Sequence, residues 1–203
     1  EFEDFTLLAN GRDLRQHTSN TASDGFPRWS PNGTRLLFTS NRNGTFDLYT
    51  MTADGTDVVR LTRDAGDNIG GAWSPDGSRI AFVSAGSGSE KLYVMRADGT
   101  DVVRLTNNAI IEGGRVVWSP DGSRLAFDAS LDGNFDVYTL DIETRTVTQL
   151  TDGPARDRFP TWPPDGLRIA FTSNRDDDDE VYVMNVDATG LVRLTRSAAL
   201  DVL

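Results

Sequence analysis

The feature that most constrains this chain is a sequence repeat with a period of 44 to 45 residues. All four tryptophans of the chain open a copy: Trp29, Trp73, Trp118 and Trp162. The copies begin WSPNGTRLLFTS, WSPDGSRIAFVS, WSPDGSRLAFDA and WPPDGLRIAFTS, and the stretch ADGTDVVRLT is identical at 53–62 and 97–106. Self-similarity with this period is typical of solenoids, propellers and repeat arrays, in which each repeat buries its faces against its neighbours.

Within each copy the apolar residues alternate with a period of two. In RIAFVS, Ile80 and Phe82 point one way while Ala81 and Val83 point the other, which predicts a strand covered on both faces. Two further β-rich runs, such as LYVM and VVRLT, follow in each copy, and the residues before each Trp make a fourth. The Ser-Pro-Asp-Gly and ADGT pieces between these runs are turn signals. Each copy is therefore predicted to be a four-stranded antiparallel meander.

Four strands in about 40–45 residues are the signature of a propeller blade. We therefore predict an all-β fold, a β-propeller of four-stranded antiparallel blades with four complete blades plus a partial fifth, in a single domain. The complete blades are expected at 24–62, 67–106, 112–151 and 157–195. The four tryptophans should lie buried between neighbouring blades, near the inner strand.

The two ends of the chain are expected to form the fifth position of the ring. Residues 4–18 align with 48–62 at a constant offset of 44, so 1–18 should form the partial blade. The tail at 196–203 is too short for the two missing strands. The chain is then either a fragment of a larger ring or has its open blade edge covered by a second copy in a homo-oligomer. We expect an imperfect five-position ring whose termini meet, with or without a second chain on the residual edge.

Composition narrows the classes of partner. The chain has 20 basic and 31 acidic residues, a net charge of -11, and no Lys/Arg cluster, which argues against nucleic-acid binding. It contains no Cys, so disulfides and thiolate metal sites are excluded. It lacks an apolar run long enough for membrane insertion, and G-x-S-x-G, H-E-x-x-H and P-loop motifs are missing.

The repeat resembles that of TolB-like propellers, a WD-type relative. The resemblance lies in WSPDG, RIAF(V/T)S, an acidic residue before (L/V)Y(V/T)M, and then DG and RLT; it covers 24–195 and, weakly, 1–18. It implies a periplasmic or extracellular protein and a non-catalytic scaffold that binds a protein or peptide partner. Similar repeats form the propeller domains of prolyl-oligopeptidase-like serine peptidases, so a domain or fragment of such an enzyme is the alternative. A recently amplified fragment with no settled partner is a third.

One set of acidic residues is the main candidate for ligand binding. It lies five or six residues before each Trp: Asp24, Asp67 with Asn68, Glu112 and Asp157. Because the first strand of a blade is innermost, these side chains are expected at the mouth of the axial channel. There they would focus a negative potential and bind calcium or a basic peptide. Ordinary solvation of loop residues is the competing explanation.

Other polar residues have weaker claims to a function. The acidic run at the tip of the last hairpin supplies weak calcium candidates: Asp176, Asp177, Asp178 and Asp179. A solvated loop explains them equally well, and no other cofactor is predicted. The single histidine, His17, occupies a position that is Leu in the other copies, and we expect a structural role. Acidic residues recur just before the Tyr-bearing strand: Asp47, Glu90, Asp136 and Glu180. Arginines recur just before the RIAF strand: Arg35, Arg79, Arg124 and Arg168. Repetition of both sets indicates structural contacts at the blade rims.

Overall fold

The computed structural model describes residues 3–6, 14–107, 115–130 and 133–196. Over these residues the regular structure is entirely β: four four-stranded antiparallel sheets and one two-stranded sheet. The predicted all-β propeller with four complete blades and a partial fifth is confirmed. The described residues include no helix that could cross a membrane.

Each complete blade is an antiparallel sheet whose strands follow one another in chain order. Blade 1 consists of β3 (Asp24–Trp29), β4 (Arg35–Ser40), β5 (Asp47–Thr52) and β6 (Val59–Arg60). Blade 2 consists of β7 (Asn68–Trp73), β8 (Arg79–Ser84), β9 (Lys91–Arg96) and β10 (Val103–Arg104). Blade 3 consists of β11 (Val116–Trp118), β12 (Arg124–Ser130), β13 (Phe135–Asp141) and β14 (Val147–Gln149). Blade 4 consists of β15 (Asp157–Thr161), β16 (Arg168–Asp176), β17 (Asp178–Asn185) and β18 (Val192–Arg193).

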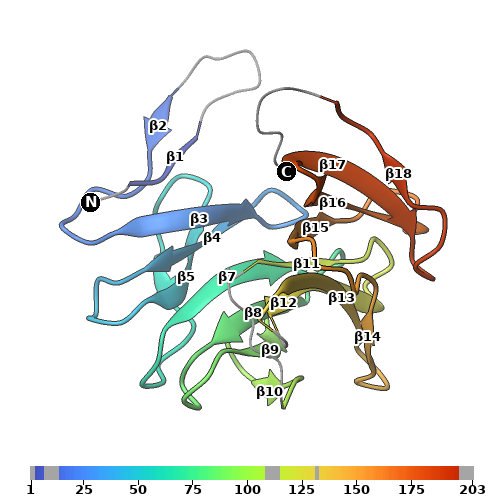
Figure 1. The fold of residues 1–203 in the computed structure, drawn as a ribbon. Helices are drawn as coiled ribbons and strands as arrows, with labels where there is room; N and C mark the ends of the chain where they lie inside the picture. Colours follow the sequence, from blue (N-terminus) through green and yellow to red (C-terminus); the bar gives the residue numbers. More distant parts are fainter. Residues whose placement is uncertain (1–2, 7–13, 108–114, 131–132, 197–203) are drawn as a thin grey trace.

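The blades fan round in chain order, with the first strand of each on the inner side (Figure 1). Along this inner side β3 contacts β7, β7 contacts β11, and β11 contacts β15. The core lies between successive blades. Leu37 and Leu48 of blade 1, for example, pack against Phe82 and its neighbours in blade 2, and all three side chains are buried. This apolar burial between blades is what makes a repeated strand meander stable.

The first strands of the chain form a partial blade beside blade 1 (Figure 1). β1 (Phe5–Thr6) pairs with β2 (Arg15–Gln16). Phe5 lies opposite Gln16, and 44 residues later Tyr49 lies opposite Arg60 in the same register. The predicted offset is therefore reproduced, and β1 and β2 are the third and fourth strands of a blade. The tail at 197–203 lies outside the described residues.

The tryptophans differ in burial. Trp118 is 8% exposed, and its Nε1 donates to the carbonyl of Ala72, in the inner strand of the preceding blade, at 3.0 Å. Trp73 and Trp162 are partly buried. Trp29, in contrast, is 45% exposed, so the prediction that it is buried is wrong. The reason is the preceding blade: Trp118 packs onto an inner strand, whereas the described part of the partial blade consists of outer strands alone.

Three of the recurring acidic residues, Asp47, Asp136 and Glu180, make a repeated rim contact of the kind that the sequence predicts, each with a threonine of the outermost strand region. In blade 1 the Thr62 hydroxyl accepts a hydrogen bond from the Leu48 amide at 3.0 Å and donates to Asp47 at 2.8 Å, while Arg60 pairs with Asp47 at 2.6 Å. Equivalent threonines accept a hydrogen bond from the corresponding backbone amide in the partial blade and in blades 2, 3 and 4: Thr18, Thr106, Thr151 and Thr195. This contact ties the outermost strand to the strand beside it.

The recurring arginines are also structural, but their partners differ. Arg35 pairs with Asp57 at 2.9 Å and Arg168 with Asp165 at 2.8 Å. Arg79 instead lies 4.8 Å from the centre of the Trp118 ring in the next blade. These contacts support the prediction that the repeated charges serve the fold.

Candidate functional site

The inner strands of all four blades enclose a cavity of about 400 Å³ on the propeller axis. Its walls comprise Phe26, Arg28, Gly70, Gly71, residues 115–117 and residues 159–161. Every blade therefore contributes to one concave site. A cavity in which several strands converge is a preferred place for a ligand.

A β-bulge in the inner strand places an aromatic side chain at this cavity twice. The pairing register shifts between Gly25 and Arg28 in blade 1 and between Arg158 and Thr161 in blade 4. In the bulge Phe26 has a φ of 57°, and the equivalent Phe159 has a φ of 56°. A bulky residue in this left-handed region costs about 1–3 kcal/mol and persists only where the surroundings hold it. Because a β-bulge redirects the side chains of its strand, the two bulges place the rings of Phe26 and Phe159 at the axial cavity.

Two arginines bring positive charge to the same cavity. The guanidinium of Arg115 lies 5.0 Å from the centre of the Phe159 ring. Desolvation by the surrounding protein lowers the pKa of Arg28, and the charge of Arg115 lowers it further. An arginine nevertheless stays protonated at neutral pH. Two cations that repel each other beside aromatic rings form a site suited to a carboxylate with an apolar neighbour.

The predicted acidic residues are placed differently. Asp24 and Asp157 are buried; Asp24 pairs with Arg42 at 3.0 Å and Asp157 with Arg175 at 3.0 Å. Asn68 is buried too, and its side-chain amide donates to Asp64 at 2.6 Å. None of these residues lines the axial cavity.

The remaining members of that acidic set differ again. Asp67 accepts a hydrogen bond from the amide of Phe46 in the preceding blade, at 2.9 Å. Glu112 lies outside the described residues. The ligand-binding role of the set stays a prediction.

A recurring tripeptide explains why Asp24 and Asp157 are neutralised. Asp24 begins β3 opposite Ser40, and Asp157 begins β15 opposite Ser173. Each serine starts the sequence Ser-Asn-Arg, at 40–42 and 173–175, whose arginine reaches back to the aspartate. The same arginine stacks on the buried Phe and Tyr of its blade; Arg42, for example, lies 4.8 Å from the centre of the Tyr49 ring. These aspartates therefore fasten the inner strand to the neighbouring hairpin.

The aspartates of the last hairpin are partly engaged. Asp176 accepts hydrogen bonds from the Tyr182 hydroxyl at 2.5 Å and from Arg193 at 3.0 Å, and Asp179 pairs with Arg156 at 3.2 Å. Asp177 occupies the turn, with a φ of 83°. Within the described part of the chain, no three carboxylate or histidine side chains are grouped to hold a metal ion. Calcium binding by Asp176, Asp177, Asp178 and Asp179 stays a prediction.

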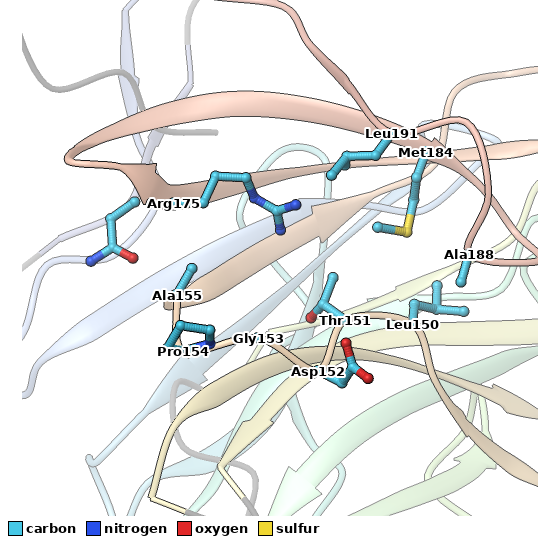
Figure 2. A pocket seen from close by; sticks show the side chains of 11 residues that line it. Leu150, Thr151, Asp152, Gly153, Pro154, Ala155, Arg175, Met184, Ala188 and Leu191 are labelled. Atoms are coloured by element: carbon cyan, nitrogen blue, oxygen red, sulfur yellow. The ribbon is translucent and has the colours of Figure 1, made fainter.

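A further cavity of about 570 Å³ lies between blades 3 and 4. Figure 2 shows Arg175 and Met184 extending from blade 4 toward the loop 150–155. The guanidinium of Arg175 is already bound by Asp157 and by the Ser173 hydroxyl, at 3.0 and 2.9 Å. This cavity is therefore a groove between adjacent blades whose main charged group is occupied.

The residues of the axial cavity were not among the sequence-based candidates. Equivalent positions of the four inner strands carry Phe26, Gly70, Arg115 and Phe159. Such variation at one repeat position, beside an invariant Trp three residues later, is a signal that could have found them. The acidic set was predicted to bind a ligand because it recurs in every repeat. Two of its members, Asp24 and Asp157, form ion pairs within their own blades.

Comparison with known proteins identifies the family. A family model described as the TolB beta propeller domain matches residues 6–115 and 112–202. The solved structure of a protein assigned as TolB from Agrobacterium tumefaciens is 27% identical, with a TM-score of 0.82 over 95% of this chain and 69% of that one. TolB from Acinetobacter baumannii is 21% identical, with a TM-score of 0.80 over 94% of this chain and 48% of its own.

Enzymes share the architecture at lower similarity. A puromycin-hydrolyzing peptidase of Mycobacterium tuberculosis is 16% identical, with a TM-score of 0.73, and this chain covers 31% of it. No curated protein sequence matches the chain. The peptidase likeness shows the fold alone, whereas the family model spans nearly every repeat. The chain belongs to the TolB β-propeller family.

Proposed function

We propose that this protein is a non-catalytic scaffold that binds a peptide segment of a protein partner on the propeller axis. The observation that carries the proposal is the axial cavity, where Arg28 and Arg115 lie with Phe26 and Phe159. A guanidinium recognises a carboxylate through paired hydrogen bonds, and the rings accept an apolar side chain. The preferred segment therefore has a carboxylate next to an apolar residue.

The charge of the whole molecule supports a peptide over a polyanion. With a net charge of -11, the average surface repels nucleic acid. A local pair of cations in such a field selects for a ligand that has few negative charges and places one of them at the axis. A cavity of about 400 Å³ is within the range of about 300–1,000 Å³ that is common for ligand pockets.

The chemistry of the cavity favours binding over catalysis. An arginine side chain keeps its positive charge at neutral pH and does not act as a base, so Arg28 and Arg115 are unsuited to general acid–base catalysis. The sole histidine, His17, lies on the partial blade, where its Nε2 is 2.6 Å from the Thr6 hydroxyl. Family membership agrees with a periplasmic or extracellular location, which is part of the proposal.

An array of octapeptides tests this function directly. Each acidic peptide places Asp or Glu beside Leu or Phe, and its control replaces the acid by Asn or Gln. We expect wild-type protein to bind acidic peptides in preference to their controls. Arg115→Gln should weaken binding at least tenfold, because a charge-assisted hydrogen bond contributes about 1.5–3 kcal/mol.

Arg96→Gln is the matched control, because Arg96 is an exposed arginine paired with Asp101 in another part of the molecule. It should leave binding unchanged. Equal binding of acidic and amide peptides, or equal binding by wild type and Arg115→Gln, would exclude the axial carboxylate site. Hydrolysis of any array peptide would instead favour the enzyme alternative.

A further inference from the structure

A second cavity, of about 470 Å³, lies between the partial blade and blade 1 and shares Phe26 with the axial cavity. Its walls include Glu3 and Asp4 from the partial blade, and Asp24, Phe26 and Phe46 from blade 1. Three carboxyl groups therefore meet two aromatic rings at the junction of two blades. The volume is within the range common for small-ligand sites.

The carboxyl groups of this cavity are unequally satisfied. Asp24 is paired with Arg42 at 3.0 Å and accepts a hydrogen bond from the Asn20 side chain at 2.6 Å. Asp4 is only 3% exposed, yet its Oδ2 has no hydrogen-bond partner among the described residues. The Oε2 atom of Glu3 is likewise buried without a partner in that part of the chain. Buried polar atoms in folded proteins are rarely left unpaired, so these two oxygens call for a donor.

The electrostatics indicate the sign of that donor. The pKa of Asp4 is raised to about 6: burial is the largest cause, the negative charges of Asp24 and Glu3 add to it, and Arg42 opposes them. One arginine faces three carboxyl groups, and it is already bound to Asp24. A cation that entered the cavity would supply the missing positive charge.

The chemistry of the walls decides between a metal ion and an organic cation. The described carboxylates do not form a group of three that could coordinate a metal. Phe26 and Phe46 instead offer apolar surface and ring faces, which favour an ammonium group on an aliphatic stem. We propose that this cavity binds an alkylammonium group, with the ammonium at Asp4 and Glu3 and the stem along the two rings. Two sources carry such a group: the lysine side chain of a peptide and a free amine.

Calorimetry with n-butylammonium at pH 7.5 tests the site, with n-butanol as the uncharged probe. We expect saturable binding of n-butylammonium and none of n-butanol. Asp4→Asn keeps the shape of the side chain but removes its charge, and should weaken binding at least tenfold. Asp101→Asn is the matched control, because Asp101 is an exposed aspartate of blade 2, and it should have no effect. Glu3→Gln, the second test variant, should weaken binding several-fold.

Binding should also weaken as the pH falls from 7.5 to 5. Protonation of Asp4 removes the charge that attracts the ligand, while Glu3, Asp24 and Arg42 face the same carboxyl and set where it titrates. Ac-Ala-Lys-Ala-amide and its norleucine counterpart distinguish the two sources. A lysine peptide that binds more tightly than n-butylammonium identifies a peptide ligand; weaker binding identifies a free amine.

Three results would overturn the proposal. The first is the absence of saturable n-butylammonium binding by folded wild-type protein. The second is equal affinity of wild type and of both Asp4→Asn and Glu3→Gln, each shown to be folded by circular dichroism. The third is calcium binding that depends on Asp4, which would replace the ammonium site by a metal site. The axial arginines take no part in these measurements, so this proposal and the axial one can fail separately.

Discussion

Asp4 shows how one residue can set the pH dependence of stability. Its folded-state pKa of about 6 lies above its ordinary value of 3.8, so ionisation is harder in the folded protein than in the unfolded chain. The contribution of Asp4 to the free energy of unfolding is therefore greatest below about pH 4, and this contribution is lost as the pH rises through about 6.

We predict that Asp4→Asn raises the free energy of unfolding at pH 7.5 by about 1–3 kcal/mol, since it removes the buried charge. The gain should shrink at pH 4, where wild-type Asp4 is protonated. Urea midpoints at the two pH values measure both effects, with Asp101→Asn as the control. A loss of stability at pH 7.5 would mean that the Asp4 carboxylate has a partner in the protein.

The tryptophans permit a comparison of one residue type in two environments. Trp118 is buried against the inner strand of blade 2 and hydrogen-bonded to Ala72, whereas Trp29 is 45% exposed. Trp118→Ala should lower the free energy of unfolding by about 3–5 kcal/mol, and Trp29→Ala by no more than about half as much. Denaturant titrations of the two variants check this. Similar losses would show that Trp29 is covered in solution.

The rim threonines connect the outermost strand of a blade to the strand beside it. Thr62 joins the Leu48 amide to the Asp47 carboxylate. Thr62→Val keeps the size of the side chain but leaves both groups without this partner, which should cost about 1–3 kcal/mol. Thr148→Val, at an exposed position of β14, is the control and should change stability by less than about 0.5 kcal/mol. If the two variants lose the same stability, the rim contact contributes little.

The strands and their order could be predicted because each depends on local information. The alternation in RIAFVS predicts a strand, and Ser-Pro-Asp-Gly predicts the turn before it. The offset of 44 aligned residues 4–18 with 48–62, and the pairing of Phe5 with Gln16 reproduces that of Tyr49 with Arg60. The same logic identified the rim contacts, because Asp47, Asp136 and Glu180 each meet a threonine at the same place in their blades.

The axial site could not be predicted in this way because it is formed where the copies differ. Phe26 reaches the cavity only because a register shift between β3 and β4 reverses its φ, which alternation alone does not reveal. Neutralisation of Asp24 likewise depends on Arg42, which lies 18 residues further along and belongs to a different hairpin. This contact forms within blade 1, where the pairing of Asp24 with Ser40 brings Arg42 beside the aspartate.

At the scale of the whole molecule, the two ends of the blade series differ in how well their faces are covered. The face of blade 1 toward the partial blade is fully buried: Leu36, Phe38, Tyr49 and Met51. The opposite face of blade 4 is more open. Val181 is partly exposed there, whereas Leu48 and Leu92, at equivalent positions of blades 1 and 2, are completely buried. Because exposed apolar faces associate, the cover that the first residues of the chain give to blade 1 matters for solubility.

Deletion of residues 1–18 tests that role. The truncated protein should expose part of the Leu36 and Phe38 face, and since a fully buried large apolar side chain contributes about 1.5–3 kcal/mol, we expect a loss of at least about 3 kcal/mol. Light scattering should then report a mass above the 22.2 kDa of one chain, with the intact protein as the control. A monomeric truncated protein with the same urea midpoint as the intact chain would contradict this role. In that case blade 1 would be stable with its first face open, and the partial blade would serve only to form the cavity at Asp4.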